Sequence, residues 1–221
     1  MLQPIIDVLF QILNYFYQLT GNYGIAIIII TLVIRALTFP LMAKQMKSTS
    51  KMQELQPELK KLQEKYKDDK ETLNKKTMEL WQKHKVNPAA GCLPLLVQMP
   101  VLIAMFRVFH DLNALQTRFD VTIDPNFLGI NLQNPDPYYI LPVLAGLTTF
   151  LQSHLTMSMP EGGGGGAGAT MKYFMPFMLL FISINLPAGL PLYFVVGNIF
   201  QLITHLIIKK PKAQTKGGAN A

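Results

Sequence analysis

Residues 23–42 constrain the fold of this chain more than any other stretch. They are apolar over roughly 20 residues, which is long enough for a helix to cross the hydrocarbon core of a bilayer, and their single charge is Arg35. A charge at that position is costly unless water, a partner or snorkelling relieves it. An arginine inside a membrane span is therefore a candidate functional residue.

A simpler interpretation of Arg35 is that it snorkels to the nearer membrane interface. Pro40 lies beyond it, however, and Lys44 and Lys47 already mark that interface. The other apolar segments hold no Asp or Glu apart from Asp111 at an edge, so the sequence offers no internal acid as a partner. We therefore expect a water-filled cavity, or a ligand that brings an acid, to satisfy the charge.

The composition is that of a membrane protein. Half of the 221 residues are hydrophobic and the mean hydropathy is positive. A single cysteine, Cys92, excludes an internal disulfide and a cysteine cluster, and the four histidines show no metal-ligand spacing. The sequence lacks a phosphate loop, a nucleophile elbow and a zinc-protease motif, so we expect no metal, no cofactor and no enzymatic activity.

The N-terminal segment, residues 4–20, is apolar but striped. Asp7, Gln11, Asn14 and Gln18 recur at spacings of four, three and four and share one helix face. The pattern favours a helix in the plane of the membrane interface. A first spanning helix and a signal peptide are the alternatives, although a signal peptide would need a basic start and a small-residue cleavage site.

Residues 44–90 predict a water-exposed antiparallel hairpin of two amphipathic helices of similar length. The segment 44–85 holds 12 of the 20 Lys and Arg residues together with seven acids. Asp69 is placed to cap the second helix, and Asn87 and Pro88 end it. The first helix carries a heptad-like seam of Met52, Leu55, Leu59, Leu62 and Tyr66.

Four further apolar segments predict spans at about 91–109, 138–157, 167–184 and 190–208. A polar, turn-rich stretch at 112–137 separates the first two. The run Gly162–Gly166 precedes the third of these segments, as a natural low-complexity loop or an engineered linker.

We therefore expect an all-α polytopic membrane protein with five transmembrane helices, an N-terminal interfacial amphipathic helix and a cytoplasmic helical hairpin. The expected parts are an extracytoplasmic interfacial helix at 1–22, a first transmembrane helix at 23–43, the cytoplasmic hairpin at 44–90, transmembrane helices two to five at 91–208, and a basic cytoplasmic tail at 209–221.

The distribution of positive charge predicts the orientation. The Lys-rich hairpin, the glycine loop with Lys172 and the basic tail fall on one side of five spans, which the positive-inside rule makes cytoplasmic. We therefore expect a multi-pass protein of a bacterial plasma membrane, with its N-terminus outside and its C-terminus in the cytoplasm.

Polar side chains inside the spans form the candidate site. Gathered around Arg35, they would line a hydrated groove that binds substrate. Each could instead join neighbouring helices through a hydrogen bond that contributes about 1 kcal/mol or less. The candidates besides Arg35 are Gln98, Gln152, Asn198 and Gln201.

Several motifs together cover nearly the whole chain. The first is IIIITLVIRALTFPLMAKQMKSTSKMQELQPELKKLQEKYKDD, with its arginine inside the span. The second is NPAAGCLPLLVQMP, and YYILPVLAGLTTFLQS and LPAGLPLYFVVGNIFQ follow it. This set resembles the YidC/Oxa/Alb family of membrane protein insertases. The combination is specific because the arginine, the GCLP-containing element and the order of five spans occur together.

The resemblance implies a five-helix core and a hydrophilic groove that contains Arg35, open to the cytoplasm and to lipid but closed to the outside. It also implies the short Gram-positive type. The chain departs from the family pattern in three respects: it has no lipobox cysteine after a signal sequence, Phe194 stands where many members carry Trp, and the loop before residue 167 is glycine-rich rather than rich in Gln and Met.

The expected function is therefore insertion and folding of nascent membrane proteins at the lipid bilayer. A ribosome and a Sec translocon are further expected partners, with no nucleic acid beyond ribosome contact. One alternative is a small secondary transporter that binds an anion at Arg35, which would predict repeated halves with broken helices. Another is a membrane adaptor whose basic hairpin and tail bind a ribosome or acidic lipids.

Overall fold

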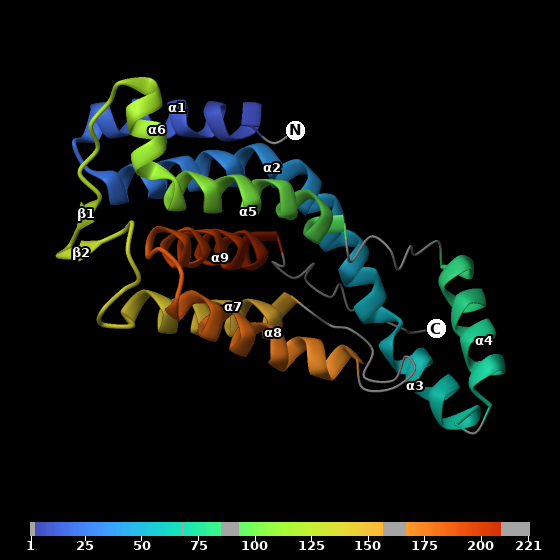
Figure 1. Ribbon diagram of the computed structural model, residues 1–221. Coiled ribbons are helices and arrows are strands. Elements are labelled where there is room, and N and C mark those ends of the chain that lie inside the picture. Colours follow the sequence, from blue (N-terminus) through green and yellow to red (C-terminus); the bar gives the residue numbers. More distant parts are fainter. Residues whose placement is uncertain (1–2, 68, 85–92, 157–166, 209–221) are drawn as a thin grey trace, which may run out of the picture.

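The computed structural model describes residues 3–67, 69–84, 93–156 and 167–208, and most of them are helical (Figure 1). The predicted end of the hairpin at Asn87 and Pro88, the glycine run and the basic tail lie outside the described residues. In chain order the elements are α1 (Gln3–Thr20), α2 (Tyr23–Glu54), α3 (Gln56–Lys65), α4 (Lys70–Lys83), α5 (Leu93–His110), α6 (Leu112–Phe119), β1 (Asn126–Phe127), β2 (Ile130–Asn131), α7 (Ile140–Thr156), α8 (Ala167–Ile184) and α9 (Gly189–Ile208).

Helix α2 runs unbroken through the predicted boundary between residues 43 and 44. Hydropathy changes there, but the residues that follow include good helix formers, and the helix continues to Glu54. It is interrupted at Leu55 because Pro57 has no N–H to donate to the carbonyl four residues before it, and this proline is accommodated in the first turn of α3. The first part of the predicted hairpin segment is therefore an extension of α2, while the predicted span 23–43 matches the apolar part of that helix.

Helices α3 and α4 contact each other and stand apart from the bundle (Figure 1). Leu59 of the predicted seam is buried, with 2% of its surface exposed. The carboxylate of Asp69 accepts a hydrogen bond from the backbone N–H of Thr72 at 3.0 Å and caps α4, as predicted. Hydrogen bonding from Thr72 also lowers the pKa of Asp69, so the cap keeps its charge at neutral pH.

Helix α1 packs on α2 and α5 through its apolar face. Ile6, Phe10 and Leu13 are buried, and their spacing of four and three places them on one side of the helix. The predicted polar stripe therefore lies away from the core. The amphipathic character of α1 is confirmed, while its place at a membrane interface stays a prediction.

The segment 112–137 is more ordered than the predicted loop. It contains α6 and a two-residue antiparallel ladder in which Phe127 pairs with Ile130. The two turn residues, Leu128 and Gly129, both have positive φ, as a tight type I′ hairpin requires. The ring of Phe127 lies so close to Gly24 of α2 that a Cβ at position 24 would overlap it. This contact fixes the ladder at the start of α2.

Helix α9 lies between α2 and α7, and α8 packs on α7 (Figure 1). Tyr23, Ile27, Phe109 and Tyr193 are fully buried where α2, α5 and α9 meet. Gly146 of α7 allows a close approach of α8. The core is therefore assembled from helices that are far apart in sequence.

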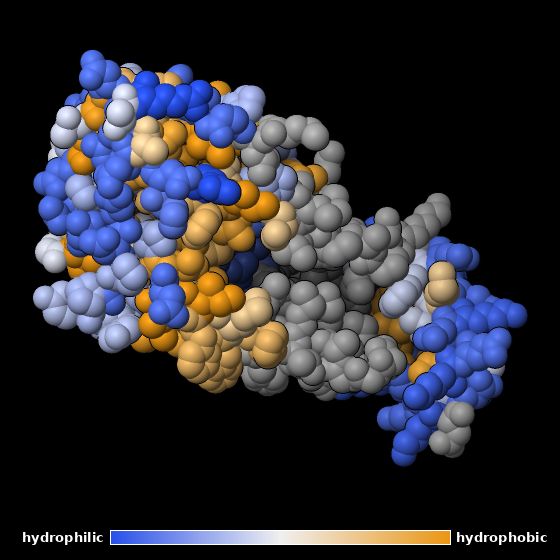
Figure 2. Space-filling model, viewed as in Figure 1, coloured by the Kyte–Doolittle hydropathy of each residue, from blue (hydrophilic) through white to orange (hydrophobic). Residues whose placement is uncertain are grey.

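The outside of the bundle is apolar. In the part of the chain that the structure describes, two helical segments are long and apolar enough to cross a membrane, Tyr23–Ala43 within α2 and Gly189–Ile207 within α9, and Ile140–Leu155 is a shorter apolar helix. Figure 2 shows hydrophobic side chains across the middle of the bundle and hydrophilic ones over the α3–α4 pair and at the opposite end. Such a band suits a lipid environment better than water. Exposed side chains in it include Leu37, Val143, Leu147, Phe174, Phe177, Phe181 and Ile203.

We expect Leu59→Asp to separate α3 from α4 and leave the bundle inserted. Burying a carboxylate in place of leucine removes about 2 kcal/mol of apolar burial and adds a desolvation cost. Hydrogen exchange should rise in residues 56–83 only. Lys61→Asp, at an exposed position of the same helix, is the control and should leave exchange unchanged. Loss of the protein from the membrane fraction would contradict an independent hairpin.

Candidate functional site

Arg35 lies in the apolar part of α2 and points into the bundle. Its side chain is 9% exposed, so it is nearly removed from solvent. In so apolar a place a guanidinium requires hydrogen-bond acceptors or a π face, because its charge cannot be neutralised by deprotonation. The surrounding residues show how this requirement is met.

Gln98 of α5 connects Arg35 to α9. The side-chain oxygen of Gln98 accepts a hydrogen bond from Nη1 of Arg35 at 3.3 Å. Nε2 of Gln98 donates a hydrogen bond to the hydroxyl of Tyr193 at 2.8 Å. The guanidinium carbon also lies 5.9 Å from the centre of the Tyr193 ring, within the range of a cation–π contact. Three helices thus contribute one side chain each to a connected polar cluster.

Gly197 gives the guanidinium its space. A Cβ at this position would lie 2.5 Å from Nη2 and 2.8 Å from Nε of Arg35, too close for either atom to stay. Gly197 follows Tyr193 by four residues, so the two lie on the same face of α9. The backbone of α9 and the Tyr193 ring therefore form one wall of the Arg35 site.

The charge of Arg35 is not cancelled within this cluster. Gln98 and Tyr193 are neutral, and the buried Nε of Arg35 has no hydrogen-bond partner within the described part of the chain. The expectation that no internal acid partners Arg35 agrees with the described residues, because its hydrogen-bond acceptor is the neutral amide oxygen of Gln98, one of the predicted candidates.

Comparisons with known proteins identify the family. The model of the 60Kd inner membrane protein family matches residues 15–216. The chain is 46% identical to membrane protein insertase YidC 2 of Bacillus anthracis, over 95% of this chain and 82% of that protein. It is 42% identical to YidC of Fusobacterium nucleatum, over 91% and 93% of the two chains. The chain belongs to the YidC family of membrane protein insertases.

Other relatives are longer than this chain. The chain spans 65% of YidC 2 of Listeria innocua, to which it is 46% identical over 86% of its own length. A crystal structure of an active YidC insertase with its first transmembrane domain resolved superposes with a TM-score of 0.71 at 26% identity. The superposed part covers 91% of this chain and 45% of the chain in that crystal structure. The predicted family resemblance is thus confirmed in both sequence and fold.

The YidC-family fold does not bring every predicted site residue to Arg35. Nδ2 of Asn198 donates to the hydroxyls of Thr148 at 3.2 Å and Thr149 at 2.7 Å, so Asn198 joins α9 to α7. Gln152 and Gln201 are half-buried on α7 and α9. Of the predicted residues, Gln98 accepts a hydrogen bond from Arg35. The roles of Gln152, Asn198 and Gln201 in a groove stay predictions.

Sequence reasoning missed Tyr193 and Gly197. Both lie in the stretch LPAGLPLYFVVGN, and their spacing of four residues was available as a signal. The described residues contain no group of three His, Cys, Asp or Glu side chains that could hold a metal ion.

We expect Gln98→Leu to destabilise the bundle by about 1.5–3 kcal/mol, because it removes a hydrogen bond to a charged group and leaves Arg35 and the Tyr193 hydroxyl without that partner. The measurement is thermal unfolding of the purified protein in detergent. Gln201→Leu is the matched control and should change the free energy of unfolding by no more than about 0.5 kcal/mol. Equal effects of the two substitutions would show that the cluster contributes no stability.

Proposed function

We propose that the chain inserts nascent membrane proteins into the bilayer, and that Arg35 attracts acidic residues in the polar flanks of its substrates. The observation that carries the proposal is the uncompensated charge of Arg35, held inside an apolar bundle by neutral partners in a chain of the insertase family. Its relatives in Bacillus anthracis and Fusobacterium nucleatum are named as insertases.

A substrate carboxylate would compete for Arg35 on favourable terms. The Gln98 oxygen is a neutral acceptor at a long 3.3 Å, whereas a carboxylate adds the attraction of an opposite charge and can bind a guanidinium through both of its oxygens. An acidic flank would therefore displace Gln98 from Arg35. It would gain the attraction to the positive charge of Arg35, which the neutral Gln98 and Tyr193 do not neutralise. The recessed hydrophilic patch among apolar side chains in Figure 2 supports a polar entry on this face.

The driving force in this scheme comes from the substrate and the membrane. Each CH₂ group that leaves water contributes about 0.8 kcal/mol, so the apolar helix of a substrate gains free energy as it enters lipid. The membrane potential acts on an acidic flank with about 2.3 kcal/mol per charge per 100 mV. The role of the protein is then to lower the barrier for the polar flank.

In the proposed topology α2, α5, α7, α8 and α9 are the five spans. The α3–α4 pair and the basic tail lie in the cytoplasm, and α6 with the β1–β2 ladder lies outside. The Lys-rich composition of residues 44–85 supports this orientation. In the same scheme the α3–α4 pair recruits substrates, with acidic lipid head groups, a ribosome or a Sec translocon as its partners.

A small anion transporter is the weaker candidate. Transporters of that kind place their substrate between broken helices of repeated halves. Helices α2 and α9, which hold Arg35 and Tyr193, are continuous through the cluster. The relatives are named as insertases rather than transporters.

The topology is testable with single cysteines in a Cys92→Ala background. We expect a cysteine at Gln82, which is exposed on α4, to react with a membrane-impermeant maleimide only after the membrane is opened. One at Asn113, exposed on α6, should react in intact cells. The reverse pattern would contradict the orientation and the cytoplasmic entry to Arg35.

The role of Arg35 is testable with paired substrates that differ only in flank charge, inserted into liposomes that carry purified protein. We expect Arg35→Lys to keep most activity because the charge remains. Arg35→Met keeps the volume but loses the charge, and should slow insertion of acidic-flank substrates by about tenfold or more. Insertion of substrates with short neutral flanks should be unchanged.

Gly197→Ala serves as a second variant, since it keeps the charge and displaces the guanidinium from α9. It should weaken the preference for acidic flanks without abolishing insertion. Equal losses for both substrates in Arg35→Met, together with a lowered melting temperature in detergent, would make Arg35 a structural residue.

A further inference from the structure

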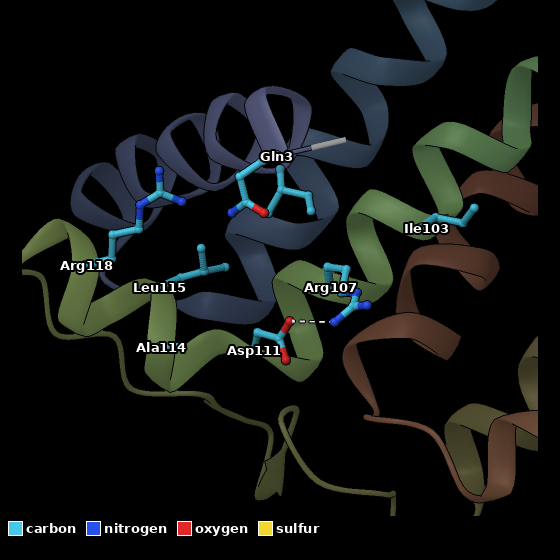
Figure 3. A pocket seen from close by; sticks show the side chains of 8 residues that line it. Gln3, Ile103, Arg107, Asp111, Ala114, Leu115 and Arg118 are labelled. Atoms are coloured by element: carbon cyan, nitrogen blue, oxygen red, sulfur yellow. Dashed lines mark hydrogen bonds and ion pairs between the residues drawn. The ribbon is translucent and has the colours of Figure 1, made fainter. Parts of the chain in front are cut away.

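A cavity of about 610 Å³ lies between α1, α5 and α6, apart from the Arg35 cluster. Figure 3 shows Arg107 and Asp111 on one side of it and Arg118 on the other, with Leu115 between them. Ile6 and Ile103 add to the apolar lining. Its volume is in the range of pockets that bind small molecules, and it combines apolar walls with a few charged groups.

One exposed face of α5 leads into this cavity. Met99, Ile103 and Arg107 follow one another at intervals of four residues and therefore lie along one side of the helix. Their exposed fractions are 42%, 40% and 57%. At 1.5 Å per residue the stripe is about 12 Å long. It begins with two apolar side chains and ends with a cation.

Arg107 retains hydrogen-bonding capacity. It has five N–H donors, and its one ion pair among the described residues is the long contact of 3.4 Å from Nη1 to Asp111. Asp111 is also held by the ring of His110 at 2.8 Å. Arg118 differs, because two of its nitrogens bind both oxygens of Asp7 at 2.7 and 2.8 Å. Arg107 is therefore the less engaged of the two guanidiniums that line the cavity.

We propose that this cavity binds one phospholipid, with its phosphodiester at Arg107 and an acyl chain along Ile103 and Met99. The order of side chains on α5 matches the order of groups in a lipid, chain first and phosphate last. Arginine forms short, charge-assisted hydrogen bonds with phosphate oxygens. Basic pockets between membrane helices bind lipid head groups in the same way.

A lipid fits this site better than a free anion does. A soluble phosphate would use Arg107 and leave Ile103, which is 40% exposed, in contact with water. The site is at the end of α5 away from the α3–α4 pair (Figure 1), where the apolar band gives way to polar residues. A phospholipid head group lies at that level of a bilayer.

Native mass spectrometry of the full chain in detergent tests the proposal, with dioctanoyl phosphatidylglycerol as the probe. We expect one molecule to bind per chain. Dioctanoylglycerol, which lacks the phosphate, and glycerol phosphate, which lacks the chains, should each bind at least about tenfold more weakly. Glycerol phosphate binding as tightly as the lipid would overturn the proposal in favour of a free-anion site.

Two variants locate the lipid. Arg107→Gln should weaken binding of the lipid by about tenfold or more, because it removes the charged donors. Ile103→Gln should weaken lipid binding while leaving the weak binding of glycerol phosphate unchanged. Lys83→Gln, at an exposed position of α4, is the matched control and should bind as the wild type does. Unchanged lipid affinity in both site variants would overturn the proposal. Weakened lipid binding in either variant, with a circular dichroism spectrum like that of the wild type, would support it.

Discussion

The burial of one positive charge organises the centre of this bundle. An arginine cannot lose its proton inside a protein, and its desolvation is costly unless hydrogen bonds and geometry compensate. Arg35 meets this requirement with an amide oxygen, an aromatic face and the bare backbone at Gly197. Each comes from α5 or α9, so placing the guanidinium also fixes how three helices meet. The position of the guanidinium against α9 thus depends on glycine at position 197, because a Cβ there would displace it.

The sequence predicted the parts of this arrangement that local patterns determine. Arg35 stands out against its apolar neighbours, the spacing of polar residues in α1 predicts its two faces, and Asp69 occupies a helix start. The cluster itself could not be derived, because Gln98 and Tyr193 are 95 residues apart. A hydropathy profile identifies polar residues within spans, but the direction in which each side chain points depends on how the helices pack. Asn198 shows the difficulty, since it lies next to Gly197 and yet binds threonines of α7.

The continuation of α2 beyond the apolar span that ends at residue 43 has a different physical cause. Hydropathy reports the solvent around a helix, while helix continuity depends on backbone hydrogen bonds and on residues that break them. The chain changes from apolar to lysine-rich near Lys44, but it meets a helix breaker only at Pro57. Similarly, the polar composition of residues 112–137 indicates exposure and turns. It gives no sign that Phe127 packs over Gly24 and orders the ladder.

The three arginines of the chain divide by the charge of their partners. Arg118 is paired with both oxygens of Asp7, and Arg107 has a single contact with Asp111. Arg35 has neutral partners and the least exposure. Because the interaction energy of two charges at a given distance is inversely proportional to the local dielectric constant, a nearly buried and unneutralised guanidinium attracts an approaching anion more strongly than an exposed, paired one. The proposed attraction of an acidic flank therefore arises at Arg35, whereas the other two cations are suited to holding α1, α5 and α6 together and to contact with a lipid head group.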